Sequence, residues 1–322
     1  MRLKAYSDNY HCQWDDFVKS SRNGTIMQER RFLSYHYPGR FEDYSLMAYN
    51  SKSKLMAVIP AALKKIGDEK IFCSYPGASH GGIVVNKMFG TDEALTLVPL
   101  LIEKCKDYGF SSIEIKMVPR IYQNWPSDEI SFALRYNGFS LMSTELATVL
   151  PLKEITLKPD YMEESVRRNI RKSEKLGVFV EESNDYATYW SILENNLMQR
   201  HNARPTHNLS EIKDLTSRYP QEIKLFGAFY EGRMIGGVVT FLMNSRVISC
   251  FYIAHNSNYQ YLRSLNLLFF KLINWGIENG YQYLDWGIST ENKGKCVNMG
   301  LFKFKEGFGG RGVIRETYSL SL

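Results

Sequence analysis

The chain has 322 residues, of which 44% are hydrophobic and 14% aromatic, and its formal net charge is +6. This composition supports a sizeable buried core and excludes wholesale disorder, and at about 150 residues per domain the length predicts two domains. The charge favours anionic partners but lies far below that of a dedicated nucleic-acid binder.

The cysteines and the apolar stretches limit the class of protein further. The five cysteines are scattered and form no CxxC pair, which argues against a disulfide framework or a zinc site and fits a reducing compartment. The histidines show no metal-ligand spacing, so we predict no metal site. No apolar stretch approaches the roughly 20 residues that span a bilayer, and the first residues lack the apolar core of a signal peptide. We therefore expect a cytoplasmic protein without a membrane span.

The first half of the chain alternates helical and strand patterns. The patterns predict two helices, a strand hairpin, a third strand, a glycine-rich loop, a long helix and a last strand, at residues 13–20, 30–37, 44–65, 70–75, 76–82, 91–108 and 111–118. Gly109 follows the long helix, where a left-handed glycine would end it.

The second half begins with a linker containing two prolines and then repeats this order. The patterns predict a basic helix from residue 164 to Gly177, a hairpin, a strand, a helix and a strand, at residues 223–243, 246–256, 265–279 and 281–287. Glu231 and Gly232 form the turn of the hairpin, and Gly280 ends the last helix.

The two halves align without gaps over one helix and the strand that follows it. An offset of 171 residues pairs 100–116 with 271–287 and places Gly109 on Gly280 and Glu114 on Asp285. Any amphipathic helix followed by a strand gives some likeness of this kind, but a similar hairpin precedes each copy. We therefore predict an α/β (α+β) fold with two domains of one design, at 1–150 and 151–322.

Two arginines on the basic helix are candidates for holding a phosphate. Arg167 and Arg171 are four residues apart and share one helix face, which suits a phosphate group. A run of charge is also common on a solvated helix face.

Standard catalytic motifs are missing from the sequence. It contains no G-x-S-x-G elbow, Walker loop or H-E-x-x-H pair, and no G-x-G-x-x-G between a strand and a helix. These absences argue against the matching hydrolases, P-loop enzymes, zinc proteases and dinucleotide-binding enzymes.

The C-terminal region holds the residues that suggest chemistry. Asp285 lies inside a strand among aromatic residues, where a carboxylate is costly unless it is paired or its pKa is useful; a structural role is equally open. Six basic residues and one acid lie between Lys293 and Arg315. The segment FKFKEGFGG belongs to a basic, aromatic, glycine-rich loop predicted over residues 298–312. As a strand it would place Lys303 and Lys305 on one face, and its glycines leave backbone amides for an anion.

The order of RRNIRKSEKLGV, LFGAFYEGRMIGGVV, YIAHNSNY, YLDWG and GLFKFKEGFGG resembles the Fem-type (FemAB-like) branch of the GNAT acyltransferase superfamily. The most specific part is G-L-x-x-F-K-x-x-F-G, from Gly300 to Gly309. The resemblance implies tandem GNAT-like domains, each with a mixed, largely antiparallel sheet flanked by helices. It implies a transferase that aminoacylates peptidoglycan precursors, with Arg167, Arg171 and Lys305 as functional residues.

The sequence departs from GNAT enzymes at the acetyl-CoA loop. Residues 260–266 (QYLRSLN) stand where Q/R-x-x-G-x-G/A is typical, so fewer amides are free for a pyrophosphate. The coiled-coil arm of some Fem proteins is also missing. We expect no tightly bound cofactor, and the donor is either an acyl-CoA or an aminoacyl-tRNA.

We therefore predict an acyl- or aminoacyltransferase that forms an amide on an amine of an anionic cell-envelope precursor of the peptidoglycan type. The expected acceptor is nucleotide-linked or phosphorylated, and tRNA is a further candidate partner. The alternatives are a CoA-dependent N-acetyltransferase acting on an amino sugar or polysaccharide precursor, a degenerate ligand-binding protein without activity, and an RNA-binding module.

Each candidate residue has an expected role. Lys305 is expected to stabilise the oxyanion or a phosphate, so that Lys305→Met lowers turnover far more than stability, and Asp285 is expected to orient or deprotonate the amine. The substrate-binding candidates are Arg167, Arg171, Tyr252, Lys303, Phe304 and Phe308.

Overall fold

The computed structural model describes residues 1–37 and 39–322, apart from the side chain of His201. The chain forms two compact units. Unit 1 contains Met1–Glu145, Asn292–Lys295 and Ile314–Leu322, and unit 2 contains Leu146–Glu291 and Cys296–Val313. This division differs from the predicted 1–150 and 151–322 because the last strand returns to unit 1, where it pairs with the strand at Ser112–Lys116.

Unit 1 contains two sheets with helices on both faces. Its helices are α1 (His11–Ser20), α2 (Arg30–Leu33), α3 (Thr91–Asp107) and α4 (Glu129–Tyr136). Its strands are β1 (Arg2–Ala5), β2 (Leu46–Tyr49), β3 (Leu55–Ile59), β4 (Ala62–Ile66), β5 (Glu69–Cys73), β6 (Val84–Val85) and β7 (Ser112–Lys116), with parts of β8 (Ser140–Pro151) and β16 (Arg311–Ser321). The orders are β1-β2-β3-β6 and β4-β5-β7-β16. Helices α3 and α4 pack together over the main core, whereas α1 packs beside β3 in a separate core.

The predicted hairpin at 44–65 forms, but its second strand is divided. Strand β3 ends at Ile59 and pairs with β2 and β6, whereas β4 begins at Ala62 and pairs with β5 in the other sheet. Pro60 lies between them and cannot donate a ladder hydrogen bond, so the strand is interrupted where the chain changes sheets.

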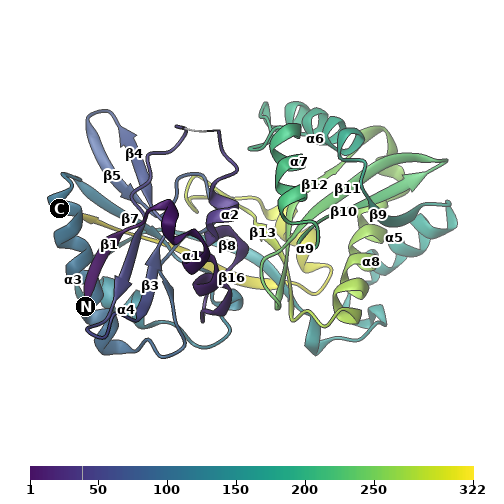
Figure 1. Ribbon diagram of the computed structural model, residues 1–322. Coiled ribbons are helices and arrows are strands. Elements are labelled where there is room, and N and C mark those ends of the chain that lie inside the picture. The colour runs from purple at the N-terminus through teal and green to yellow at the C-terminus, as the bar shows by residue number, and fades with distance from the viewer. Residues whose placement is uncertain (38) are drawn as a thin grey trace. The chain divides into compact units, whose positions relative to one another are not determined.

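Unit 2 contains a six-stranded sheet between two layers of helices and a separate two-stranded sheet. Its helices are α5 (Glu164–Lys175), α6 (Tyr186–His201), α7 (Leu209–Arg218), α8 (Ser264–Glu278) and α9 (Met299–Glu306). Its further strands are β9 (Phe179–Ser183), β10 (Ile223–Tyr230), β11 (Arg233–Leu242), β12 (Val247–His255), β13 (Tyr283–Ile288), β14 (Thr290–Glu291) and β15 (Cys296–Val297). The order is β8-β13-β12-β11-β10-β9, and only β12 and β13 run parallel. Figure 1 shows α6 and α7 on one face of the sheet and α5 and α8 on the other.

The predicted repeat is present in both units. In each, a helix lies between two parallel strands in the chain. The connection from β5 to β7 contains β6 and then α3, and α8 connects β12 to β13. A left-handed glycine follows each helix, Gly109 with a φ of 72° and Gly280 with a φ of 77°, which is the conformation that glycine adopts without steric cost. Glu114 and Asp285 each occupy the third and last parallel pair before the strands separate. The predicted α/β fold with mixed, largely antiparallel sheets is confirmed.

The apolar face of α8 forms the centre of the core of unit 2. Leu268, Phe269 and Leu272 are completely buried against the sheet. Burying each such side chain contributes about 1.5–3 kcal/mol, which is more than the intrinsic helix propensity of any of these residues.

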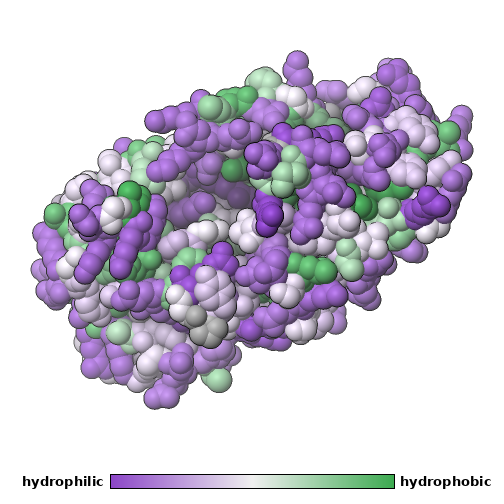
Figure 2. Space-filling view, turned by 90° about the horizontal axis from the view of Figure 1, so that it is seen from above, coloured by the Kyte–Doolittle hydropathy of each residue, from purple (hydrophilic) through white to green (hydrophobic). Residues whose placement is uncertain are grey.

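Side chains on the face seen in Figure 2 are mainly hydrophilic, with apolar ones in small groups.

The basic, glycine-rich loop predicted over residues 298–312 contains a helix, because residues 302–305 lie in α9. The Asn298 side chain caps this helix by accepting a hydrogen bond from the Leu301 amide at 3.0 Å. Phe302 and Lys305 are both buried, and their spacing of three residues suits a helix. The alternation of Phe and Lys imitates the period of a strand.

A buried histidine lies in the glycine-rich loop of unit 1. His80 is 1% exposed, contacts Thr25 Oγ1 through Nε2 at 3.0 Å and stacks on Tyr122. Burial, together with the nearby cations of Arg315 and Lys116, lowers the pKa of His80 to about 3. The imidazole is therefore neutral in the folded protein at neutral pH.

This histidine predicts acid sensitivity. Its folded pKa lies below the usual value of 6.5, so stability present above pH 6.5 is lost as the pH falls towards 3, because the unfolded chain binds the proton first. At pH 5 the loss is about 2 kcal/mol. Urea unfolding at pH 7 and pH 5 measures it, and His80→Phe should remove about this much of the difference. An unchanged difference in His80→Phe would contradict the prediction.

Candidate functional site

The functional site of unit 2 begins where two parallel strands separate. Strands β12 and β13 pair at three positions only, ending at Ser249 and Asp285. Beyond them β12 continues to His255, whereas β13 becomes irregular and turns through Gly287, whose φ is 73°. The separation leaves the sheet open between the two strand ends.

A pocket of about 890 Å³ fills this opening. Its walls come from β12, the end of β13 and the first turn of α8, with α5, α6 and α9 around them. Lining residues include Val166, Asn196, Arg200, Cys250, Ile253, His255, Gln260, Arg263, Leu265, Asn266, Trp286, Ser289, Thr290, Lys303, Phe304 and Lys305. All of them belong to unit 2.

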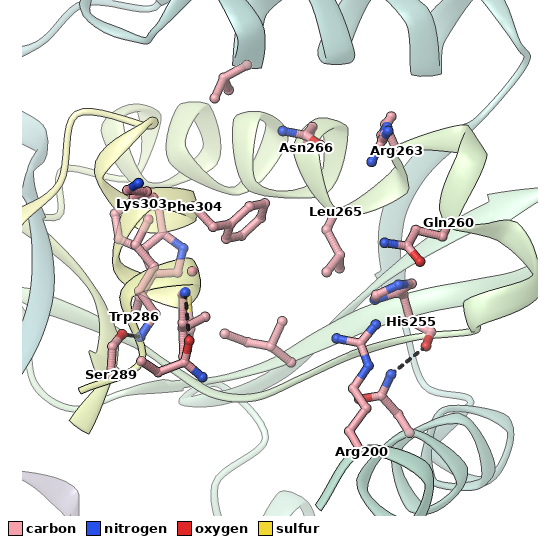
Figure 3. A pocket seen from close by; sticks show the side chains of 18 of the residues that line it. Arg200, His255, Gln260, Arg263, Leu265, Asn266, Trp286, Ser289, Lys303 and Phe304 are labelled. Carbon is pink, nitrogen blue, oxygen red and sulfur yellow. Dashed lines mark hydrogen bonds between the residues drawn. The ribbon is translucent and has the colours of Figure 1, made fainter. Parts of the chain in front are cut away.

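The two ends of the pocket differ in chemistry. Figure 3 shows Trp286 and Ser289 at one end, beside α9, and Arg200 and His255 at the other. Apolar side chains, among them Leu265, lie between the ends. The pocket is therefore suited to a ligand with an apolar middle and polar groups at both ends.

Lys305 lies in the wall of the pocket and is only 2% exposed. Its Nζ donates to the carbonyl oxygens of Gly287 at 2.9 Å and Ile288 at 3.0 Å, and to Ser289 Oγ at 2.7 Å. An ammonium has three N–H groups, and these three acceptors use all of them. In this arrangement Lys305 holds residues 287–289 and has no N–H left for a substrate oxygen.

Asp285 is completely buried and does not belong to the pocket lining. Its Oδ1 accepts a hydrogen bond from the Gly287 amide at 2.7 Å, which fixes the turn at the end of β13. The pKa of the Cys250 thiol is raised by burial and by Asp285 and is lowered by Lys305. Both charges therefore lie close to the same buried thiol.

The structure brings three of the eight predicted site residues to the pocket. Lys303 is exposed at its rim, and Phe304 and Lys305 complete this wall. Phe308 is completely buried and packs against the Trp286 ring with a centroid separation of 5.8 Å. It therefore supports the pocket from behind.

The remaining three predicted residues lie elsewhere. Arg167 is half-buried and Arg171 exposed on α5, and neither lines the pocket. Tyr252 is 9% exposed and forms a hydrogen bond through its hydroxyl to His207 Nδ1 at 2.6 Å, on the side of the sheet covered by α6. A role for these three in binding substrate stays a prediction.

Three polar atoms in the pocket wall are buried and have no hydrogen-bond partner among the described residues. They are Trp286 Nε1, Thr290 Oγ1 and His255 Nε2. Trp286 and Thr290 are 3% and 8% exposed, so solvent reaches little of either side chain. Such groups normally have partners in native proteins, which are other protein groups, ordered water or a ligand.

His255 is the last residue of β12 and is half-buried. Burial lowers its pKa, and the nearby Arg200 guanidinium lowers it further. The imidazole is therefore neutral at neutral pH and has one ring nitrogen that accepts a hydrogen bond. In Figure 3, Arg200 and Gln260 lie around it.

The first turn of α8 has an unusual cap. Arg263 precedes the helix with a φ of 56°, a left-handed conformation that glycine adopts more readily. It stands at the first glycine position of the Q/R-x-x-G-x-G/A pattern, and Leu265 stands at the second. The helix start and the Arg263 guanidinium together provide positive charge at this end of the pocket.

Sequence reasoning did not single out His255, Arg263, Trp286 or Thr290. The signal for Arg263 was present, since a long side chain replaced an expected glycine. The others required knowledge of where β12 and β13 separate.

Among the described side chains no group of three His, Cys, Asp or Glu residues is arranged to hold a metal ion. No helix within residues 1–37 and 39–322 is long and apolar enough to cross a membrane.

Comparisons with known proteins agree on the fold. Residues 162–303 match the family model described as an acetyltransferase (GNAT) domain. No curated protein sequence matches the chain. Among solved structures, FemX is similar over 100% of this chain and 98% of its own, with a TM-score of 0.73 and 13% identity.

Two further structures share this fold. The C-terminal domain of a putative lysylphosphatidylglycerol synthetase from Agrobacterium fabrum is similar over 97% of this chain and 92% of its own, with a TM-score of 0.63 and 10% identity. A tandem GNAT protein from the clavulanic acid biosynthesis pathway is similar over 99% and 98%, with a TM-score of 0.55 and 9% identity.

The geometry of Lys305 predicts that it contributes to stability. Lys305→Met should lower the free energy of unfolding by about 3 kcal/mol, because it leaves three buried acceptors without their donor. Chemical denaturation measures this loss. Lys303→Met, on the same helix but exposed, is the matched control and should change stability little. Equal stability of the two variants would contradict the prediction.

Proposed function

We propose that the pocket of unit 2 binds an activated acyl donor for transfer to an amine. Residues 162–303 match the acetyltransferase (GNAT) domain family, and the chain is an acyltransferase. One observation carries this proposal. The matched residues include every residue that lines the pocket except Phe304 and Lys305. The family resemblance and the cavity therefore coincide in the chain.

The reaction forms an amide. The amine nitrogen attacks the acyl carbonyl carbon, and the oxygen becomes an oxyanion in the tetrahedral intermediate. The intermediate then collapses, the bond from carbon to the sulfur or oxygen of the leaving group breaks, and the leaving group receives the proton that the amine loses. A protein can assist by accepting that proton and by donating hydrogen bonds to the oxyanion.

The donor is an acyl thioester or ester joined to a phosphate-bearing carrier, as in an acyl-CoA or an aminoacyl-tRNA. Two features of the pocket favour the binding of a phosphate group. Arg200 and Arg263 gather at one end, and the positive end of α8 lies beside Arg263. The apolar residues between the two ends suit the arm that joins the phosphate to the acyl group. A carrier of either kind fits this distribution.

The acceptor is an amine on an anionic, nucleotide-linked or phosphorylated precursor of the peptidoglycan type. Support comes from the likeness to FemX and from a second neighbour whose name describes a lysylphosphatidylglycerol synthetase, which joins an aminoacyl group to an anionic molecule. Exposed cations in unit 2, with Lys303 at the rim of the pocket, favour an acceptor of this charge.

A CoA-dependent N-acetyltransferase is the second candidate. The description of the matching family and Gln260, which keeps the first position of the acetyl-CoA loop, favour it. Leu265 argues against a CoA-dependent enzyme, because its large side chain stands where a small residue usually leaves room for the pyrophosphate of CoA.

A transfer assay tests the proposed function. Acyl-CoA and aminoacyl-tRNA donors are each combined with UDP-linked muropeptide and amino-sugar acceptors, and the amide product is measured by mass spectrometry. We expect transfer from one donor class to the muropeptide amine. The matched donor should also raise the free energy of unfolding by about 2.7 kcal/mol when present at 100 times its Kd. Absence of product from every combination would contradict the proposal.

Arg263 gives a second prediction. Arg263→Gly removes the guanidinium but relaxes the left-handed backbone, so the affinity for the phosphate-bearing donor should fall about tenfold while stability changes by no more than about 1 kcal/mol. Titration calorimetry and denaturation measure the two effects. Glu231→Gly is the matched control, since Glu231 has a φ of 48° in a turn outside the pocket. If both variants bind the donor equally well, Arg263 does not hold the phosphate.

A further inference from the structure

The strongest unassigned feature of unit 2 is a row of hydrogen-bond donors at one end of the pocket. It lies in the five residues Trp286–Thr290, which we call the donor segment. Trp286 and Thr290 line the pocket, and their polar atoms Nε1 and Oγ1 are buried and have no partner in the part of the chain that the structure describes. Ser289 Oγ accepts from Lys305 at 2.7 Å, which leaves its own hydrogen free to donate.

Contacts within the pocket wall hold the residues between these donors. Lys305 holds the carbonyls of Gly287 and Ile288 and the hydroxyl of Ser289. The Asp285 carboxylate holds the Gly287 amide. The donor segment is thus fixed at three consecutive residues before any ligand binds, which is the preorganisation that transition-state stabilisation requires.

Aromatic packing fixes the Trp286 ring. Phe269 meets it edge to face with a centroid separation of 5.7 Å, and Phe308 packs against it at 5.8 Å. Gly310 lies so close that a Cβ there would come within 3.1 Å of the indole. The motif GLFKFKEGFGG therefore supplies the lysine, the phenylalanine and the glycine that hold the donor segment.

The charged end of the pocket indicates which part of the donor molecule reaches this segment. Arg200 and Arg263 lie at the end away from Trp286 and Ser289. A phosphate-bearing carrier held by the arginines would extend its acyl group past the apolar residues towards α9. The donor segment contributes neutral N–H and O–H groups. Such groups are better suited to binding a carbonyl oxygen than to binding a charged phosphate.

We propose that Trp286 Nε1–H and Thr290 Oγ1–H donate hydrogen bonds to the acyl carbonyl oxygen and stabilise the oxyanion, and that Lys305 is the positioning residue of this site. The inference rests on the proposed function and assigns the carbonyl oxygen to named donors. As the amine forms the C–N bond, the carbonyl π electrons move to the oxygen between these donors. They return when the bond to the leaving group breaks, and the amine proton leaves with that group.

Two isosteric variants and two matched controls test the donors. Trp286→Phe and Thr290→Val each remove one donor and should lower kcat about 100-fold with little change in KM for the acyl donor. Trp190→Phe and Thr148→Val remove an indole N–H and a hydroxyl that are also buried and without partners in the described chain, but outside the pocket. The controls should keep the kcat of the wild type.

The outcomes separate this inference from the proposed function. If the wild type transfers no acyl group from any donor, the proposed function fails and the inference fails with it. If the wild type is active and the pocket variants match their controls in kcat, only the inference is overturned, and the unpartnered atoms are then a niche for ordered water. Equal increases in KM with unchanged kcat would also overturn it, because they indicate uniform binding.

The positioning role of Lys305 has its own test. If Lys305 acts through the donor segment, the double variant Lys305→Met/Thr290→Val should lose no more kcat than Lys305→Met alone, measured under conditions where both remain folded. Additive losses would show that Lys305 acts independently and would overturn this part of the proposal. Lys305→Arg, which keeps a cation for the same acceptors, should recover at least part of the kcat lost in Lys305→Met.

Discussion

The buried ammonium of Lys305 is the constraint on which the pocket of unit 2 depends. Removing an ammonium from water costs several kcal/mol unless every N–H finds an acceptor. The chain meets this requirement by directing two carbonyls and one hydroxyl of residues 287–289 at a single point. To bring these acceptors to Lys305, the backbone turns away from β12 at Gly287, which has a left-handed conformation. This turn opens the sheet between β12 and β13. The hydrogen bonds of the Lys305 ammonium therefore determine the course of the backbone that forms this wall of the pocket.

The sequence motif around Lys305 is mainly a scaffold for residues outside it. Phe308 and Gly310 pack on Trp286 and Lys305 holds Ser289, while Phe304 provides one wall of the cavity. The groups with unused hydrogen-bonding capacity lie in the preceding strand and its extension. A motif can thus be specific for a function while most of its side chains never meet the ligand.

Local patterns were sufficient to predict most of the fold but only part of the site. Helix α8 and its glycine cap follow from an apolar period of 3.6 and a left-handed position, both local signals. The helix at residues 302–305 is not evident from the sequence, because alternating Phe and Lys has the period of a strand. In the structure Phe302 and Lys305 are both buried, as their spacing of three residues allows in a helix. Trp286 and His255 could not be placed, because their role depends on the separation of β12 from β13. That separation is a tertiary property with no local signature.

The repeated design differs between the two units at the ends of their parallel strands. In unit 1 the parallel pair β5 and β7 also ends at an acidic residue, but its own glycine-rich loop occupies the space beyond. The Ser74 hydroxyl accepts from the Lys116 amide at 2.7 Å, and the Gly81 amide donates to the Lys116 carbonyl at 3.2 Å. A Cβ on Gly81 would lie 2.4 Å from a Ser74 oxygen, so the loop closes only because that residue is glycine. The cavity left there is about 210 Å³, against about 890 Å³ in unit 2. The same strand geometry therefore gives a filled core in one copy and a binding pocket in the other.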